Sequence, residues 1–164
     1  MRTLLLLALL SLGCRTPRDV LPTHELSQDL GREVATSGSI EQPVIDRTNA
    51  ERKTAGLRPL IESPQLAEAA RRHAADMARH DELAHNLNGR TAADRVKAAG
   101  FEYRAVGENI AWNQPTPKAA VDVWMNSRGH RRNLLGEEFT HIGVGMAVNA
   151  KGEPYWVQVF GTPR

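Results

Sequence analysis

Apolar residues recur at three- and four-residue intervals between positions 64 and 78, a spacing that predicts an amphipathic helix. Ser63 and Pro64 stand before it as an N-cap and a first helical residue. Much of the stripe is alanine, so the helix can pack closely against a sheet or a second helix. We interpret His73, within the stripe, as a hydrogen-bonded structural histidine. The buried stripe is Leu66, Ala69, Ala70, His73, Ala74, Met77 and Ala78.

Three further helices are predicted from periodicity and from start and stop residues. The first begins near Pro43 and stops at Gly56. The second runs from Thr91, its N-cap, to Gly100, and the third covers about residues 116 to 127. Gly129 is expected to end or bend the third helix and to redirect His130. A short helical turn with Asn133 and Leu134 follows.

Strict alternation of apolar and small residues predicts a strand over 140–148, and a second strand is predicted over 155–160. Residues 149–152, with the sequence Asn-Ala-Lys-Gly, suit a hairpin connection between them. The small face of the first strand, formed by Gly143, Gly145 and Ala147, is expected to let a helix or another strand approach closely.

The N-terminus has the pattern of an export signal. Arg2 precedes the apolar run Leu4–Leu12, which is too short to span a membrane. Cys14 stands where a bacterial lipoprotein signal is cut, although Ser11 occupies the position where leucine is most expected. The prediction is a signal peptide over 1–13, a flexible tether over 14–42 with a short helix near 26–34, and a domain over 43–164. The alternative is an ordinary signal peptide cut nearby, without a lipid on Cys14.

The composition limits how the fold can be stabilised, how many domains the chain can form and what it can bind. Cys14 is the single cysteine, so no intramolecular disulfide is available and packing must stabilise the fold. About 120 residues after the tether suffice for one domain with one core. The formal net charge of +2 comes from 21 basic and 19 acidic residues that are interspersed, which excludes a nucleic-acid footprint. We interpret the basic cluster Arg128–Arg132 as a solvated surface turn.

Two imidazoles and one carboxylate, those of His85, Glu108 and His130, are the candidate site. Histidine titrates near neutral pH and is the commonest metal ligand, and a carboxylate is its natural partner around a divalent cation. Each residue could also have a purely structural role. The histidines could be hydrogen-bonded loop residues, and the carboxylate could be bound by backbone amides. Gly107 is expected to allow unusual backbone angles beside Glu108. Five residues are expected to support the site: Asn109, Trp124, Ser127, Arg131 and Asn133.

An ordered set of motifs resembles the CAP superfamily, also called SCP-like: the cysteine-rich secretory, antigen-five and pathogenesis-related proteins and their bacterial relatives. The resemblance covers about residues 43 to 163. Its motifs are Asn49-Ala50-Glu51-Arg52, Leu83-Ala84-His85-Asn86, Gly107-Glu108-Asn109-Ile110-Ala111, Val123-Trp124-Met125-Asn126-Ser127, Gly129-His130-Arg131, Ile142-Gly143-Val144-Gly145 and Tyr155-Trp156-Val157-Gln158.

The resemblance implies an α+β fold, a three-layer alpha-beta-alpha sandwich with a central antiparallel sheet. It also implies a cleft lined by two histidines and two acids, which holds a divalent metal in some members. His85 and Glu108 match the first histidine and the first acid, whereas Ser127 stands in place of the second acid. His130 is expected to supply the second imidazole. The three side chains then either hold zinc or another divalent cation, or form a hydrogen-bonded cluster without metal.

The sequence leaves three functions open. The first is an exported, lipid-anchored module that binds a small ligand, a peptide or a cell-envelope component. The second is a hydrolase that uses a metal-activated water or an acid–base pair including Glu108. The third is a structural protein of the envelope. The interpretation leans away from an enzyme, because Ser127 lacks the strained turn of a nucleophile. The chain is expected in the bacterial envelope, where a lipid on Cys14 anchors it to the membrane. Without that lipid it is expected in the periplasm or outside the cell.

Overall fold

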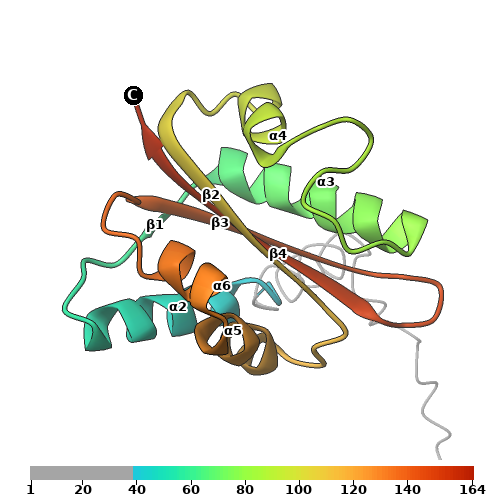
Figure 1. Cartoon of the computed structure of the whole chain (residues 1–164), viewed down its shortest axis with the longest axis horizontal. Coiled ribbons are helices and arrows are strands. Elements are labelled where there is room, and N and C mark those ends of the chain that lie inside the picture. The colour runs from blue at the N-terminus through green and yellow to red at the C-terminus, as the bar shows by residue number, and fades with distance from the viewer. Residues whose placement is uncertain (1–38) are drawn as a thin grey trace, which may run out of the picture. The chain divides into compact units, whose positions relative to one another are not determined.

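The computed structural model describes residues 39–164. Helices and strands are interspersed along this part of the chain, which Figure 1 colours from blue toward the N-terminus to red at the C-terminus. Their bounds are α2 Gln42–Thr54, β1 Ile61–Glu62, α3 Pro64–His80, α4 Ala92–Ala98, β2 Tyr103–Trp112, α5 Pro117–Asn126, α6 Arg128–Leu134, β3 His141–Val148 and β4 Pro154–Pro163.

The four strands form one sheet in the order β1-β3-β4-β2. β4 lies between β3 and β2 and pairs antiparallel with both, which confirms the predicted antiparallel sheet and the hairpin at 149–152. The two-residue strand β1 pairs parallel with β3 and is the exception. β2 is a long edge strand that the sequence indicated only as an extended segment, because polar residues interrupt its apolar pattern.

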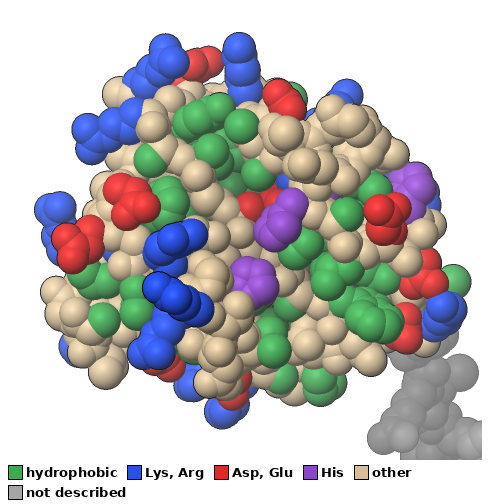
Figure 2. Space-filling model, viewed as in Figure 1, with side chains coloured by type: hydrophobic (Ala, Val, Ile, Leu, Met, Phe, Trp, Pro, Cys, Tyr) green, Lys and Arg blue, Asp and Glu red, His purple; other side chains and the backbone are tan. Residues whose placement is uncertain are grey.

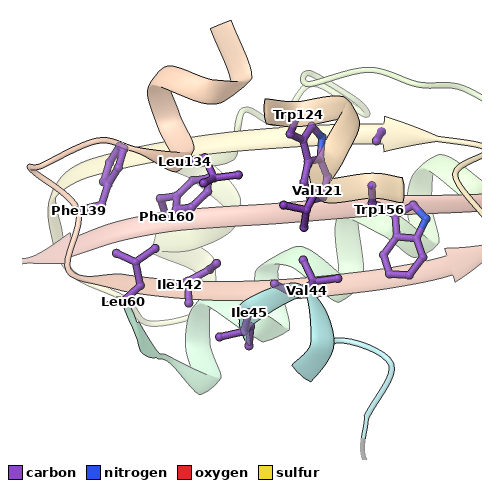
Figure 3. Packing of buried hydrophobic residues seen from close by; sticks show 13 residues of the cluster. Val44, Ile45, Leu60, Val121, Trp124, Leu134, Phe139, Ile142, Trp156 and Phe160 are labelled. Atoms are coloured by element: carbon purple, nitrogen blue, oxygen red, sulfur yellow. The ribbon is translucent and has the colours of Figure 1, made fainter. Parts of the chain in front are cut away.

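Helices cover both faces of the sheet, which confirms the three-layer α+β sandwich (Figure 1). α3 and α4 lie on one face, where Leu66 and Val96 belong to a core with Val157 and Val159 of β4. On the other face, α2, α5 and α6 pack over a second core that is rich in aromatic residues (Figure 3). Its labelled side chains are Val44, Ile45, Leu60, Val121, Trp124, Leu134, Phe139, Ile142, Trp156 and Phe160.

The small residues of β3 let α3 lie directly on the sheet. A Cβ atom at Gly143 would stand 2.1 Å from the backbone nitrogen of Ala67, and one at Gly145 would stand 2.3 Å from that of Arg71. These distances are far shorter than any van der Waals contact. The predicted close approach of a helix to this face is therefore confirmed.

Side-chain caps start the helices where the sequence placed them. Ser63 accepts a hydrogen bond from the backbone N–H of Leu66, and Thr91 forms a capping box with Asp94. The expected stop at Gly129 is wrong. The break falls at Ser127, whose extended backbone ends α5 and precedes α6, and Gly129 lies inside α6. Ser127 is a favourable residue before a helix, and a glycine in the first turn is tolerated there.

The guanidinium of Arg52 is a buried structural element in the α2 layer. It donates hydrogen bonds to the backbone oxygens of Arg58, Leu134 and Gly136, at 3.0, 3.0 and 2.9 Å. Burial lowers the pKa of Arg52, and the charge of Glu138 partly offsets this effect. Arg52 thereby fixes the loop after α6 to the first helix.

The expectations for residues 1–38 lie outside the described residues. They are the signal peptide, most of the tether with its short helix, and the lipid on Cys14. Across residues 39–164, none of the helices combines the length and the apolar character that a membrane crossing requires.

Candidate functional site

Strand β2 distributes two adjacent polar side chains to opposite faces of the sheet. Successive residues of a strand alternate in direction. Glu108 therefore points with Ile110 toward the α3 and α4 layer, and Asn109 points with Ala111 toward the other layer. Both polar side chains are buried, at 7% and 0% exposure. An edge strand thus carries two buried polar groups whose partners must come from both helical layers.

The carboxylate of Glu108 joins His85 to Arg95. Its Oε1 lies 2.9 Å from Nδ1 of His85, and its Oε2 accepts a 2.7 Å hydrogen bond from the Arg95 guanidinium. Arg95 also donates to the backbone oxygens of His85 and Arg90, both at 2.9 Å. The buried charge of Glu108 is therefore paired, and the same guanidinium holds the loop that carries His85.

His73 of α3 is a second imidazole near this carboxylate. It is 1% exposed, and its Nε2 lies 3.8 Å from Oε1 of Glu108. Within residues 39–164 neither ring nitrogen has a hydrogen bond of ordinary geometry, while a backbone contact with Ala84 acts to raise its pKa. Burial lowers its pKa, and the neighbouring charge of Glu108 offsets only part of that effect. His73 is therefore neutral at pH 7.

Amide side chains place His130 on the other side of β2. Asn109 donates to the backbone oxygen of His130 at 3.0 Å, and Asn133 donates to the side-chain oxygen of Asn109 and to the backbone oxygen of Glu108, both at 3.0 Å. These bonds fix α6 against the strand. Asn109 and Asn133 therefore connect α6 to the strand that carries Glu108.

The amide network continues into the core. Gln158 of β4 stands directly opposite Asn109 and accepts a 3.3 Å hydrogen bond from it. The Gln158 amide nitrogen donates to the Thr48 hydroxyl at 2.7 Å, and that hydroxyl donates to the backbone oxygen of Val44 at 2.8 Å. A continuous chain of hydrogen-bonded polar groups thus runs from α2, along one face of the sheet, to α6.

The two candidate imidazoles come from opposite layers and flank the edge strand. The His85 side chain is 53% exposed, and His130 is half-buried. Burial lowers the pKa of His130, and the nearby His85 lowers it further. In the orientation of Figure 1, Figure 2 shows histidine side chains near the centre of the face on which β2 lies. The structure therefore brings His85, Glu108 and His130 into one region.

Three supporting residues act differently from the expectation. Trp124 is fully buried in the core and supports β2 by donating from Nε1 to the backbone oxygen of Ile110 at 3.0 Å. Ser127 contributes no capping bond from its side chain, only the break between α5 and α6. Arg131 is exposed and lines a neighbouring groove.

Gly107 also has a different role from the predicted one. Its φ is not in the positive range that favours glycine. A Cβ atom there would stand 2.8 Å from the ring of Phe139. Gly107 therefore provides space for the second core beside the site.

The donor set does not fit a metal held directly by His85, Glu108 and His130. Both oxygens of Glu108 are occupied, one by His85 and the other by the Arg95 cation. Across residues 39–164, no three His, Cys, Asp or Glu side chains are arranged to hold a metal ion. Glu108 orients an imidazole here, and it does not share a cation with that imidazole.

Sequence reasoning missed the participation of Arg95 and Gln158 and the closeness of His73 to Glu108. Arg95 lies in a short, charged helix whose pattern is typical of a surface. Gln158 carried a usable signal, because it is polar and stands between Trp156 and Phe160 in a strand that is otherwise apolar. The signal of His73 was an imidazole on an otherwise apolar helical stripe.

His73 predicts a specific dependence of stability on pH. Its folded pKa is lowered from 6.5, so the unfolded chain takes up this proton first. The penalty is absent well above pH 6.5 and grows as the pH falls through that value. We expect His73→Leu to reduce the loss of unfolding free energy between about pH 7 and 5, measured by urea denaturation. His130 titrates in the same direction, so the loss is reduced and not abolished.

His80 is the matched control for this prediction, because it is exposed at the end of the same helix. His80→Leu is expected to leave the slope with pH as in the parent protein. A slope that is the same in the His73→Leu variant and in the parent contradicts the assignment.

Comparison with known proteins gives consistent matches. Residues 45–160 match the model of CAP, the Cysteine-rich secretory protein family. The uncharacterized protein YkwD of Bacillus subtilis (strain 168) is 40% identical over 121 residues, which are 73% of this chain and 46% of YkwD. An uncharacterized membrane protein of that bacterium, YlbC, is 32% identical over 78% of this chain and 37% of its own length. The chain thus spans less than half the length of these relatives.

Solved structures agree. An extracellular protein containing a SCP domain from Bacillus anthracis superposes with a TM-score of 0.69 at 34% identity, covering 74% of this chain and 40% of its own. An outer surface protein from Borrelia burgdorferi gives the same TM-score, 0.69, at 21% identity, over 73% of this chain and 90% of its own; this likeness concerns the fold alone. With the three-layer fold and the match over most of residues 39–164, the chain belongs to the CAP, or cysteine-rich secretory protein, family.

Proposed function

We propose that this CAP domain is an exported binding module that holds a small ligand, a peptide or a cell-envelope component at His85 and His130. The SCP-domain protein from Bacillus anthracis is described as extracellular, which supports an exported role. A lipid on Cys14 would keep the module at the membrane surface. This anchor rests on the sequence pattern around Cys14.

The bond between Nδ1 of His85 and Oε1 of Glu108, at 2.9 Å, carries the proposal. A carboxylate that accepts from Nδ1–H fixes the tautomer and the orientation of the ring. Nε2 is then a hydrogen-bond acceptor on a side chain that is 53% exposed. An oriented, accessible acceptor is useful for recognition, because little conformational entropy is lost when a ligand binds.

His130 complements His85 electrostatically. Its pKa is lowered by burial and by His85, so its ring is neutral at pH 7 and offers both a donor and an acceptor. The Asn109 and Asn133 amides hold its backbone in place. The site therefore recognises polar groups such as amides and hydroxyls through direct hydrogen bonds.

A hydrolase is the second candidate, and the His85–Glu108 pair specifically favours it. An imidazole oriented by a buried carboxylate is the arrangement of a general base. Release of soluble products from envelope polymers that disappears in Glu108→Gln would support this candidate. Turnover that is the same in Glu108→Gln and in the parent would exclude it.

The binding proposal is tested by NMR titration of the full chain with muropeptides and, separately, with envelope lipids in detergent. We expect shifts of the His85 and His130 ring signals with EDTA present, and about tenfold weaker binding in His85→Ala and His130→Ala. His80→Ala is the control. Probes that leave the ring signals unchanged, or that bind His85→Ala as well as the parent, contradict the proposal. Binding that requires added zinc contradicts direct hydrogen bonding.

A further inference from the structure

The strongest unexplained feature away from His85, Glu108 and His130 is a groove of about 710 Å³ along α6. Its apolar part includes Met125 and Leu135, which pack on the core. The remaining lining residues are Asn126, Arg128, Arg131, Arg132, Gly136, Glu137 and Glu138. A surface hollow with an apolar part and several cations has the features of a binding site.

Three exposed arginines stand in this groove on one side of α6. Arg128, Arg131 and Arg132 are related by three and four residues, a spacing that puts side chains on the same face of a helix. Figure 2 shows Lys and Arg side chains gathered over the place where Figure 1 draws α6, beside the central histidines.

Six other surface cations of residues 39–164 are paired with carboxylates, and these three arginines are not. Arg47, Arg71, Arg72, Arg79, Lys118 and Lys151 each lie within 3.4 Å of a carboxylate oxygen. Within residues 39–164, no carboxylate oxygen lies within 4.0 Å of the guanidinium nitrogens of Arg128, Arg131 or Arg132. Their hydrogen-bonding capacity is therefore available to a ligand.

The two carboxylates of the groove do not cancel this charge. The charge of Glu138 also acts on the buried guanidinium of Arg52. The lining of the groove has three arginines against two carboxylates, so it keeps one net positive charge. Arg52 also fixes the wall of the groove, since it binds the backbone oxygens of Leu134 and Gly136. The groove is thus cationic, and hydrogen bonds from Arg52 fix the backbone at its edge.

We propose that this groove binds a phosphodiester-linked polymer of the cell envelope. Guanidinium groups recognise phosphate through paired, charge-assisted hydrogen bonds, and three of them on one helical face can engage successive phosphates of one chain. The apolar part accommodates the carbon units between the phosphates. A concave groove suits a single polymer chain, whereas a flat bilayer surface cannot enter it. The groove lies outside the His85–Glu108 pair and does not depend on the function proposed for that pair.

The test is calorimetric titration of the full chain with a synthetic oligo(glycerol phosphate). We expect binding that weakens as NaCl is raised, and a loss of about tenfold or more in Arg131→Gln/Arg132→Gln. Arg72→Gln/Arg79→Gln removes the same charge from α3 and is expected to bind as the parent does. Both pairs of side chains are exposed, so the fold is retained.

Four results would overturn the proposal. They are an equal loss in the α3 control, equal binding of polyglutamate, binding of phosphatidylglycerol vesicles but not of the oligomer, and no binding of the oligomer at low salt. The first shows a general charge effect, and the second shows recognition of any polyanion. The third assigns the groove to a membrane surface. The fourth shows that the groove does not bind a phosphodiester polymer.

Discussion

Replacement of Arg95 by methionine is expected to lower the free energy of unfolding by about 3 to 5 kcal/mol. The Arg95 and Glu108 side chains are 7% and 3% exposed, so methionine leaves a buried carboxylate without its cation. The backbone oxygens of Arg90 and His85 also lose a donor. Urea denaturation at pH 7 measures the loss of stability. We also expect broadened NMR signals from the His85 ring, because its loop loses the hydrogen bond from Arg95.

A double-mutant cycle separates the charge pair from the packing of Arg95. Glu108→Gln alone leaves the Arg95 guanidinium buried without an anion and is also expected to destabilise the protein. The double variant Arg95→Met/Glu108→Gln removes both charges, so its cost is expected to be smaller than the sum of the single costs. Additive costs would show that the two residues do not depend on each other.

Gly143→Ala is expected to destabilise the protein by about 3 kcal/mol or more, although it adds a single methyl group. That methyl group would stand 2.1 Å from the backbone of α3 at Leu66 and Ala67. Backbone cannot move aside as a flexible side chain can, so α3 must lift from the sheet. Thermal and urea denaturation measure the loss.

Gly129→Ala is the matched control for the same chemical change. Gly129 lies inside α6, and a Cβ atom there meets nothing within 4 Å. Alanine is the better helix former, so this variant is expected to be neutral or more stable by up to about 1 kcal/mol. A Gly143→Ala variant as stable as Gly129→Ala would mean that α3 does not rest on β3 as the structure shows.

The helices and the β3–β4 hairpin could be predicted because their signals are local. Ser63 and Thr91 sit a few residues from the amide groups that they cap, and the alternation in 140–148 lies within one strand. The break at Ser127 was harder to predict, because Ser127 and Gly129 are two plausible helix boundaries in sequence. Contacts between distant segments decide between them.

The sequence indicated which residues to consider at the site, but not the hydrogen bonds that connect them. His85, Glu108 and His130 stood out as residue types, and the structure does bring them together. The partner of the carboxylate is Arg95, at 2.7 Å, which belongs to a helix with a surface-like pattern. The amide chain through Asn109, Gln158 and Thr48 depends on strand register and layer packing. Such long-range pairing leaves no trace in local periodicity.

The position of β4 bears on how the domain acquires its fold. β4 is the last of the four strands in the sequence, yet it lies between β2 and β3 and supplies both with their hydrogen-bonding partner. Until β4 has emerged, β2 and β3 have no strand between them to pair with, and both cores lack their central wall. The two cores are therefore expected to close only when the last segment of the domain is present.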